Sequence, residues 1–219
     1  MEIKNNFLSV VTLGSFNPAI LTPEFLRTEG IWFSEEHMPK GTSSPVVSDI
    51  KFGDISFFVE LERFQVMHKN VKRLNDSPLV EAASKYLNTL RYTPVLLQGI
   101  NFNVDIIGYG NSKEIKVLLE DPINKISDYF DEAEEYLLDL RTAIRNGKSD
   151  NQSINCKFYI SPGISISINL RKADANLVLN YNYEVKDIKS DNTRLDLIPN
   201  GYNSIYENFM QFIKRLRGE

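Results

Sequence analysis

The segment Thr93-Pro94-Val95-Leu96-Leu97-Gln98-Gly99-Ile100-Asn101-Phe102-Asn103-Val104-Asp105-Ile106 decides the fold. From Ile100 onward, apolar residues alternate with the polar residues Asn101, Asn103 and Asp105. A period of two residues predicts a β-strand with one buried face and one polar face. Pro94 restricts the preceding residue to extended backbone, so the strand is expected to begin here. Residues 78–91 lead directly into this strand, and their apolar side chains recur at the spacing of an α-helix.

The same two periods predict the remaining elements. Gly53-Asp54 is expected to form the turn of one hairpin, and Thr22-Pro23 matches the N-cap and first residue of a helix. Residues 34–45, 68–77 and 146–153 are expected to be loops. Strands are expected at residues 7–13, 46–50, 55–66, 93–106, 114–119, 154–160, 164–170 and 177–185, and helices at residues 23–29, 78–91, 122–144 and 202–217.

This order predicts an α+β fold, with a mainly antiparallel sheet and helices packed on one face. A chain of 219 residues with 42% hydrophobic residues has enough material for one core, so a single domain spanning residues 1–219 is expected. The strand at residues 55–60 is followed by the helix at 78–91, as the strand at 176–181 is followed by the helix at 202–217. The similarity indicates two related strand-strand-helix halves, residues 1–111 and 112–219, as one organisation of the domain.

Two short motifs carry a resemblance to a family. Asn17-Pro18-Ala19-Ile20 has the form Asn-Pro-x-Ile, and the segment from Thr93 to Asn101 has the form Thr-Pro-Val-x-x-x-Gly-Ile-Asn. In these motifs the chain resembles a family of bacterial proteins with no assigned activity. The resemblance covers the motifs only and implies no reaction.

Composition sets further bounds. The formal net charge of −4 argues mildly against a protein that binds nucleic acid over a large surface. The single cysteine, Cys156, allows no internal disulfide and is expected on the apolar face of a strand. No run approaches 18 apolar residues, so we expect a cytoplasmic protein without a membrane segment. The many Lys, Asn and Ile residues indicate an AT-rich genome, bacterial or phage.

No catalytic motif is present in the sequence. The two histidines, His37 and His68, lie 31 residues apart without metal-ligand spacing, and no nucleophile elbow or glycine-rich phosphate loop occurs. Glu60 and Glu62 are expected on one strand face, where they are either solvated charges or ligands of a divalent cation. The first interpretation is favoured, and no metal site or cofactor is predicted.

Amides occupy the polar side of several predicted strands. Asparagine is disfavoured in strands, so its recurrence there indicates either a hydrogen-bonding surface for a partner or compositional drift in an AT-rich genome. The residues predicted to form such a partner-binding face are Asn101, Asn103, Asn180 and Asn182, and Asn155 and Asn169 follow the same pattern.

Basic residues gather between the strand at 55–66 and the helix at 78–91. Lys69, Lys72 and Arg73 could contact a nucleic-acid backbone, with Arg194 as the equivalent of Arg73 if the halves are related.

The sequence thus favours a non-catalytic interaction or assembly subunit of a bacterial or phage multiprotein system. Its expected partner is another protein or a second copy of the chain. A nucleic-acid-binding module using the basic loop is the first alternative. A metal-dependent hydrolase using Glu60, Glu62 and a histidine is the second.

Overall fold

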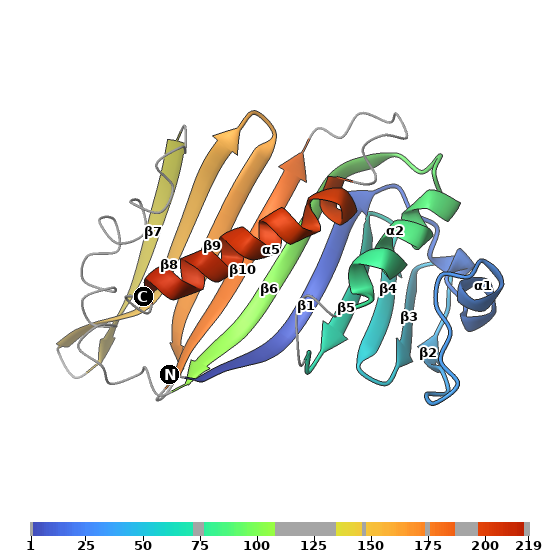
Figure 1. Cartoon of the computed structure of the whole chain (residues 1–219), viewed down its shortest axis with the longest axis horizontal. Coiled ribbons are helices and arrows are strands. Elements are labelled where there is room, and N and C mark those ends of the chain that lie inside the picture. Colours follow the sequence, from blue (N-terminus) through green and yellow to red (C-terminus); the bar gives the residue numbers. More distant parts are fainter. Residues whose placement is uncertain are drawn as a thin grey trace. The chain divides into compact units, whose positions relative to one another are not determined.

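The structure is a computed structural model that describes residues 2–71, 77–107, 135–145, 148–173, 176–186 and 197–216. It is an α+β fold whose strands are paired mainly antiparallel (Figure 1). None of the described helices is long and apolar enough to span a membrane. The elements are β1 (Glu2–Gly14), η1 (Pro18–Ile20), α1 (Pro23–Thr28), β2 (Lys40–Thr42), β3 (Val47–Phe52), β4 (Ile55–Glu60), β5 (Arg63–Lys69), α2 (Leu79–Thr89), β6 (Val95–Ile107), β7 (Glu135–Arg145), β8 (Lys148–Ser161), β9 (Ile164–Ala173), β10 (Asn176–Lys186) and α5 (Leu197–Leu216).

The chain forms two compact units. The early unit comprises Phe7–Asn101 and Val185–Ser204, and the late unit comprises Met1–Asn6, Phe102–Glu184 and Ile205–Glu219. Strands β1 and β6 each contribute residues to both units.

In the early unit the strand order is β2-β3-β4-β5-β1, followed by the first part of β6. Val66 of β5 lies opposite Phe57 of β4 on one side and Val10 of β1 on the other. All three side chains are buried, as the alternating burial of these strands requires. Helix α2 packs on this face, where Tyr86 stacks on Phe64 with ring centroids 4.1 Å apart.

Local sequence explains where helix α1 begins. The Thr22 hydroxyl accepts a hydrogen bond from the Phe25 amide at 3.0 Å, and Pro23 occupies the first turn of α1. Both features confirm the sequence prediction for this helix. Helix α2 also has the predicted position, and its Leu79, Tyr86 and Leu87 are buried.

In the late unit the order is β6-β10-β9-β8-β7. Helix α5 contributes the residues that cover the buried strand face: Phe209 stacks on Phe102 at 4.7 Å and meets Tyr181 edge-on at 5.5 Å. The predicted strand of the opening segment is confirmed as β6, with Ile100, Phe102, Val104 and Ile106 fully buried. Helix α5 begins at Leu197, five residues before the predicted start.

One predicted strand is wrong. Residues 55–66 form two strands, β4 and β5, joined by a turn at Leu61 and Glu62, with Glu60 opposite Arg63. The apolar positions change from odd numbers (Phe57, Val59) to even numbers (Phe64, Val66) across this turn, so all four share the buried face. No glycine or proline marked the reversal. Strand β5 then continues through His68 and Lys69, which were expected in a loop.

The helix predicted at residues 122–144 is also wrong over residues 135–144, the part of it that the structure describes. Residues 135–145 form β7, paired with β8, and β8 includes residues 148–153, which were expected to be a loop. Arg145 pairs with Lys148 across the sequence Asn146-Gly147, the residue pair most typical of a two-residue hairpin. The predicted elements at residues 114–119 and 122–134 lie outside the described residues.

Candidate interaction surfaces

The polar strand face of the late unit carries three of the four amides predicted to form the partner-binding face. Asn103 belongs to β6, Asn180 and Asn182 belong to the neighbouring β10, and all three are half-buried. Their strand neighbours Phe102 and Tyr181 point to the buried face, which confirms the predicted alternation. Asn101 has the same alternation in β6, but its contacts place it in the early unit.

Several amides on this face bond to each other. The Asn6 side-chain amide donates to Asn103 Oδ1 at 3.2 Å. The Asn169 side-chain amide of β9 donates to Asn155, the residue directly opposite it on β8. Cross-strand side-chain pairs of this kind stabilise a sheet. The amide-rich face therefore has a structural role in holding neighbouring strands.

A charged pair completes this polar face. Lys157 Nζ lies 3.2 Å from Glu184 Oε1, and these side chains are 27% and 16% exposed. Ser165 Oγ lies 3.4 Å from the same carboxylate oxygen, and Lys157 also lies over the Tyr159 ring. Because the charges and hydroxyl satisfy one another, this cluster is a cross-strand network rather than an open ligand site.

The predicted basic surface is described only in part. Lys69 is exposed at the end of β5, opposite Phe7 of β1. Lys72, Arg73 and Arg194 lie outside the described residues. His68 is half-buried beside Lys69, and its Nδ1 lies 2.9 Å from the Ser77 hydroxyl. Burial lowers the pKa of His68 from its usual 6.5, although the Asp54 carboxylate acts in the opposite direction.

The premise of the metal-site alternative is wrong. Glu60 ends β4 and Glu62 lies in the turn that follows, so the two carboxylates do not share a strand face. Over the described residues, no three His, Cys, Asp or Glu side chains form a group that could hold a metal ion. Cys156 is buried as predicted, and burial raises the pKa of its thiol to about 12.

An apolar rim, which no sequence pattern predicted, lies at one end of the early unit. Of the eight large hydrophobic residues that are exposed in the described chain, six belong to this rim: Leu13, Val46, Val47, Leu61, Tyr92 and Leu96.

Backbone hydrogen bonds bring the parts of the rim together. The Phe16 amide donates to the Leu61 carbonyl at 2.8 Å, and the Ser15 amide donates to the Pro94 carbonyl at 3.0 Å. Val47 lies opposite Glu60, the residue before Leu61. Four segments therefore meet at the same end of the strands: the end of β1, the start of β3, the β4–β5 turn and the start of β6.

The rim ends in a cation–π pair. Tyr92 is 83% exposed, and the Arg91 guanidinium lies 5.0 Å from the centre of its ring. Tyrosine and arginine are enriched in protein–protein interfaces. The sequence feature that could have predicted the rim is the position of its leucines and valines, which occur at strand ends and turns rather than on a buried stripe.

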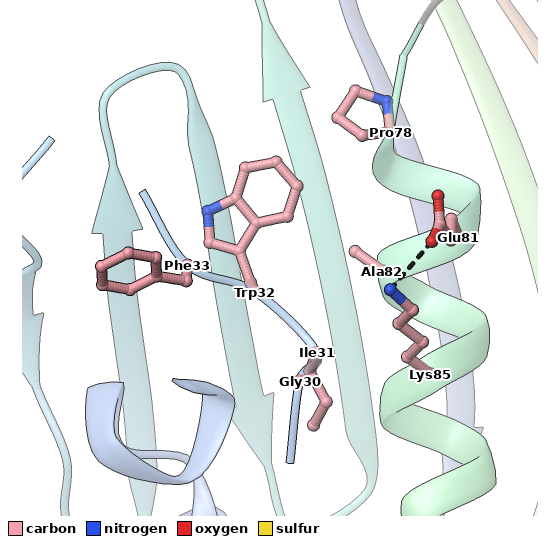
Figure 2. Close-up of a pocket in the computed structure, with 8 residues that line it drawn as sticks. All are labelled: Gly30, Ile31, Trp32, Phe33, Pro78, Glu81, Ala82 and Lys85. Carbon is pink, nitrogen blue, oxygen red and sulfur yellow. Dashed lines mark ion pairs between the residues drawn. The ribbon is translucent and has the colours of Figure 1, made fainter. Parts of the chain in front are cut away.

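A pocket of about 240 Å³ lies between the segment Gly30–Phe33 and the first turns of α2 (Figure 2). Trp32 forms one wall, and Pro78, Ala82 and the side chains of Glu81 and Lys85 form the other. Glu81 and Lys85 make an ion pair at 2.8 Å, drawn in Figure 2 on the helix side of the pocket. All of these residues belong to the early unit.

Comparison with known proteins gives no family. Neither a protein-family model nor a curated protein matches the sequence significantly. The chain is similar to a rolling circle replication initiator protein from Geobacillus stearothermophilus at 12% identity, covering 86% of this chain and 76% of that one, with a TM-score of 0.35.

Two further solved structures are similar at the same level. Ara h 8.0201 matches at 10% identity over 55% of this chain and 96% of its own, with a TM-score of 0.30. The di-domain ARO/CYC StfQ from the steffimycin biosynthetic pathway matches at 11% identity over 85% of this chain and 75% of its own, with a TM-score of 0.33. At these TM-scores the similarities carry no argument about fold or function.

Proposed function

We propose that this chain is a non-catalytic interaction subunit of a bacterial or phage system, acting in the cytoplasm, and that it binds a protein partner through the apolar rim. The rim is the observation that supports the proposal. Soluble domains seldom leave several large apolar side chains exposed at one place unless another surface covers them. Within the rim, Leu61, Leu96 and Tyr92 are 57%, 67% and 83% exposed.

The chemistry of the rim favours a protein surface over a small ligand. Its residues lie at or next to the ends of four different strands, whereas a small-molecule site is usually a concave pocket. Arg91 and Tyr92 add the residue types that dominate binding energy in protein interfaces. Exposed Glu60 and Glu62 flank Leu61 and supply a polar border to the apolar centre.

Affinity purification with matched variants tests this proposal. The tagged protein and its Leu61→Arg/Leu96→Arg double variant would be purified from the native host under nuclease treatment. A Met38→Arg variant is the control, because Met38 is 80% exposed but lies outside the rim. We expect a stoichiometric protein partner with the wild type and the control, and its loss with the double variant.

Two outcomes contradict the proposal. One is a partner that the double variant retains. The other is a partner set that disappears with nuclease, which would favour the nucleic-acid alternative and the basic loop around Lys69. If the purified wild type sediments as a dimer and the double variant as a monomer, the partner is a second copy of the chain.

We also propose that the domain contains two related halves. Strand β1 pairs with β5, the last strand of the meander β2–β5 that precedes α2, and β6 neighbours β10, the last strand of the meander β7–β10 that precedes α5. The common order supports a duplication whose boundary lies before β6 rather than after residue 111. Such a duplication predicts that helices α2 and α5 pack on the same face of the sheet. A crystal structure with α2 and α5 on opposite faces would exclude it.

A further inference from the structure

We propose that the pocket beside α2 receives one large apolar side chain, preferably aromatic, from a partner segment that carries lysine or arginine on either side of it. This site is separate from the apolar rim, and the proposal does not depend on the rim's function. It rests on the size of the pocket, on the way its walls are held, and on the charges around it.

The volume limits what can enter. A cavity of about 150 Å³ can bind benzene, whereas drug-sized ligands occupy about 300–1,000 Å³. The pocket, at about 240 Å³, is therefore large enough for a phenylalanine or leucine side chain and small for a complete organic ligand. Its lining combines the apolar side chains of Trp32, Pro78 and Ala82 with the charged side chains of Glu81 and Lys85, and the apolar part suits such a side chain.

The wall that contains Trp32 is held in place. The amides of Ile31 and Trp32 both donate to the Leu26 carbonyl, at 2.9 and 3.1 Å, so the chain is fixed where it leaves α1. The indole ring packs against buried Phe57, with centroids 6.2 Å apart. Figure 2 shows Trp32 between Phe33 and helix α2. A wall that needs no rearrangement loses little conformational entropy on binding.

Phe33 stays exposed at the pocket. Its side chain is 59% exposed, and it is one of only two large exposed hydrophobic residues in the described chain that lie outside the rim. Figure 2 places its ring beyond Trp32, on the side away from α2. A side chain inserted against Trp32 would bring its neighbouring backbone over Phe33 and cover it.

Acidic side chains surround the same segment. Glu29, Glu35 and Glu36 are exposed and lie within four residues of the pocket-lining residues Gly30–Phe33, and they form no ion pair with any residue that the structure describes. Arg27, the basic residue nearest to Glu29 in sequence, is engaged by Glu24 at 2.7 Å, and Lys40 is the basic residue nearest to Glu35 and Glu36. Opposite charges flanking an apolar anchor raise the association rate and select the partner, so basic residues beside the anchor fit this site.

Trp32 is the only tryptophan in the chain, so its fluorescence reports directly on the pocket. The probes are acetylated, amidated pentapeptides: Lys-Lys-Phe-Lys-Lys, the same peptide with Ala in place of Phe, and Glu-Glu-Phe-Glu-Glu. We expect a saturable change in emission with the first, at least about tenfold weaker binding of the second because the buried apolar area is lost, and no saturable change with the third.

Three variants of the full chain give matched controls. Phe33→Ala is expected to weaken binding of the first peptide, and Leu61→Ala in the rim is expected to leave it unchanged. The triple variant Glu29→Lys/Glu35→Lys/Glu36→Lys is expected to prefer Glu-Glu-Phe-Glu-Glu. Equal binding of the Phe and Ala peptides, wild-type binding by Phe33→Ala, or an unchanged charge preference in the triple variant would each overturn the proposal. None of these results depends on whether the rim binds a protein.

Discussion

The aromatic rings of Phe64 and Tyr86 lie face to face, 4.1 Å apart and 11° from parallel, and join strand β5 to helix α2. Both side chains are completely buried. The Tyr86 hydroxyl is buried without a hydrogen-bond partner among the described residues, and burial raises the pKa of this phenol. This contact holds one wall of the Trp32 pocket in place, because Tyr86 and the pocket residues Ala82 and Lys85 belong to the same helix.

Replacing Tyr86 by phenylalanine should not destabilise the protein. The substitution removes a buried hydroxyl that makes no hydrogen bond, so the free energy of unfolding should stay unchanged or rise by up to about 1 kcal/mol. Tyr86→Ala should lower it by about 3–5 kcal/mol, because it leaves a cavity beside Phe64. Urea denaturation of both variants measures the difference. A large loss of stability in Tyr86→Phe would show that the hydroxyl has a partner.

Gly14→Ala should destabilise the protein through one steric contact. A Cβ atom at residue 14 would lie 2.2 Å from the Pro94 carbonyl oxygen, and backbone hydrogen bonds on both sides prevent the strands from separating. We expect a loss of about 1–3 kcal/mol in chemical denaturation.

The control is Gly30→Asn, because Gly30 has φ +64° and open space around its missing Cβ. Asparagine tolerates this left-handed conformation, so the loss at residue 30 should stay below about 1 kcal/mol. Equal losses at residues 14 and 30 would show that the Pro94 contact is not responsible.

The thiol of Cys156 should be inert in the folded protein. It is 5% exposed, and burial raises its pKa to about 12, so little thiolate forms at pH 8. A disulfide reagent should therefore react with it slowly in buffer and stoichiometrically within the mixing time in strong denaturant. Rapid modification of the native protein would contradict the burial of this strand face.

Stability should fall in mild acid because of His68. Burial lowers the pKa of this histidine in the folded state below the 6.5 of the unfolded chain, so the unfolded state binds more protons as pH decreases. The contribution of His68 is present above pH 6.5 and is lost as pH falls from about 6.5 towards the folded-state pKa.

Urea denaturation at pH 5 and pH 7 measures this loss. His68→Gln should reduce the difference in unfolding free energy between the two pH values, while the same substitution at the exposed His37 should leave it unchanged. If both histidine variants keep the wild-type difference, another group is responsible.

Periodic segments could be predicted from the sequence because their buried and polar faces recur at a fixed interval. The alternation from Ile100 to Ile106 predicted β6 and its buried face, and Thr22-Pro23 predicted the start of α1. The burial of Cys156 followed from the same alternation in β8.

Turns without glycine or proline could not be predicted in this way. At Leu61 and Glu62 the chain reverses with no turn residue, and only the change from odd to even apolar positions marks it. For residues 135–145 the opposite occurred: Asn146-Gly147 was a hairpin signal, but apolar residues at helical spacing outweighed it in the prediction.

Sequence alone determined the faces of the long strands and the absence of recognised catalytic motifs, because both depend on the order of residues within short segments. Only the tertiary structure decided which distant residues share a surface. Leu13, Leu61 and Leu96 form one rim because β1, the β4–β5 turn and β6 end at the same edge. Trp32 and Lys85 line one pocket because residues 30–33 and α2 both pack within the early unit. Such contacts arise from strand pairing and helix packing between residues far apart in the chain, and no local pattern encodes them.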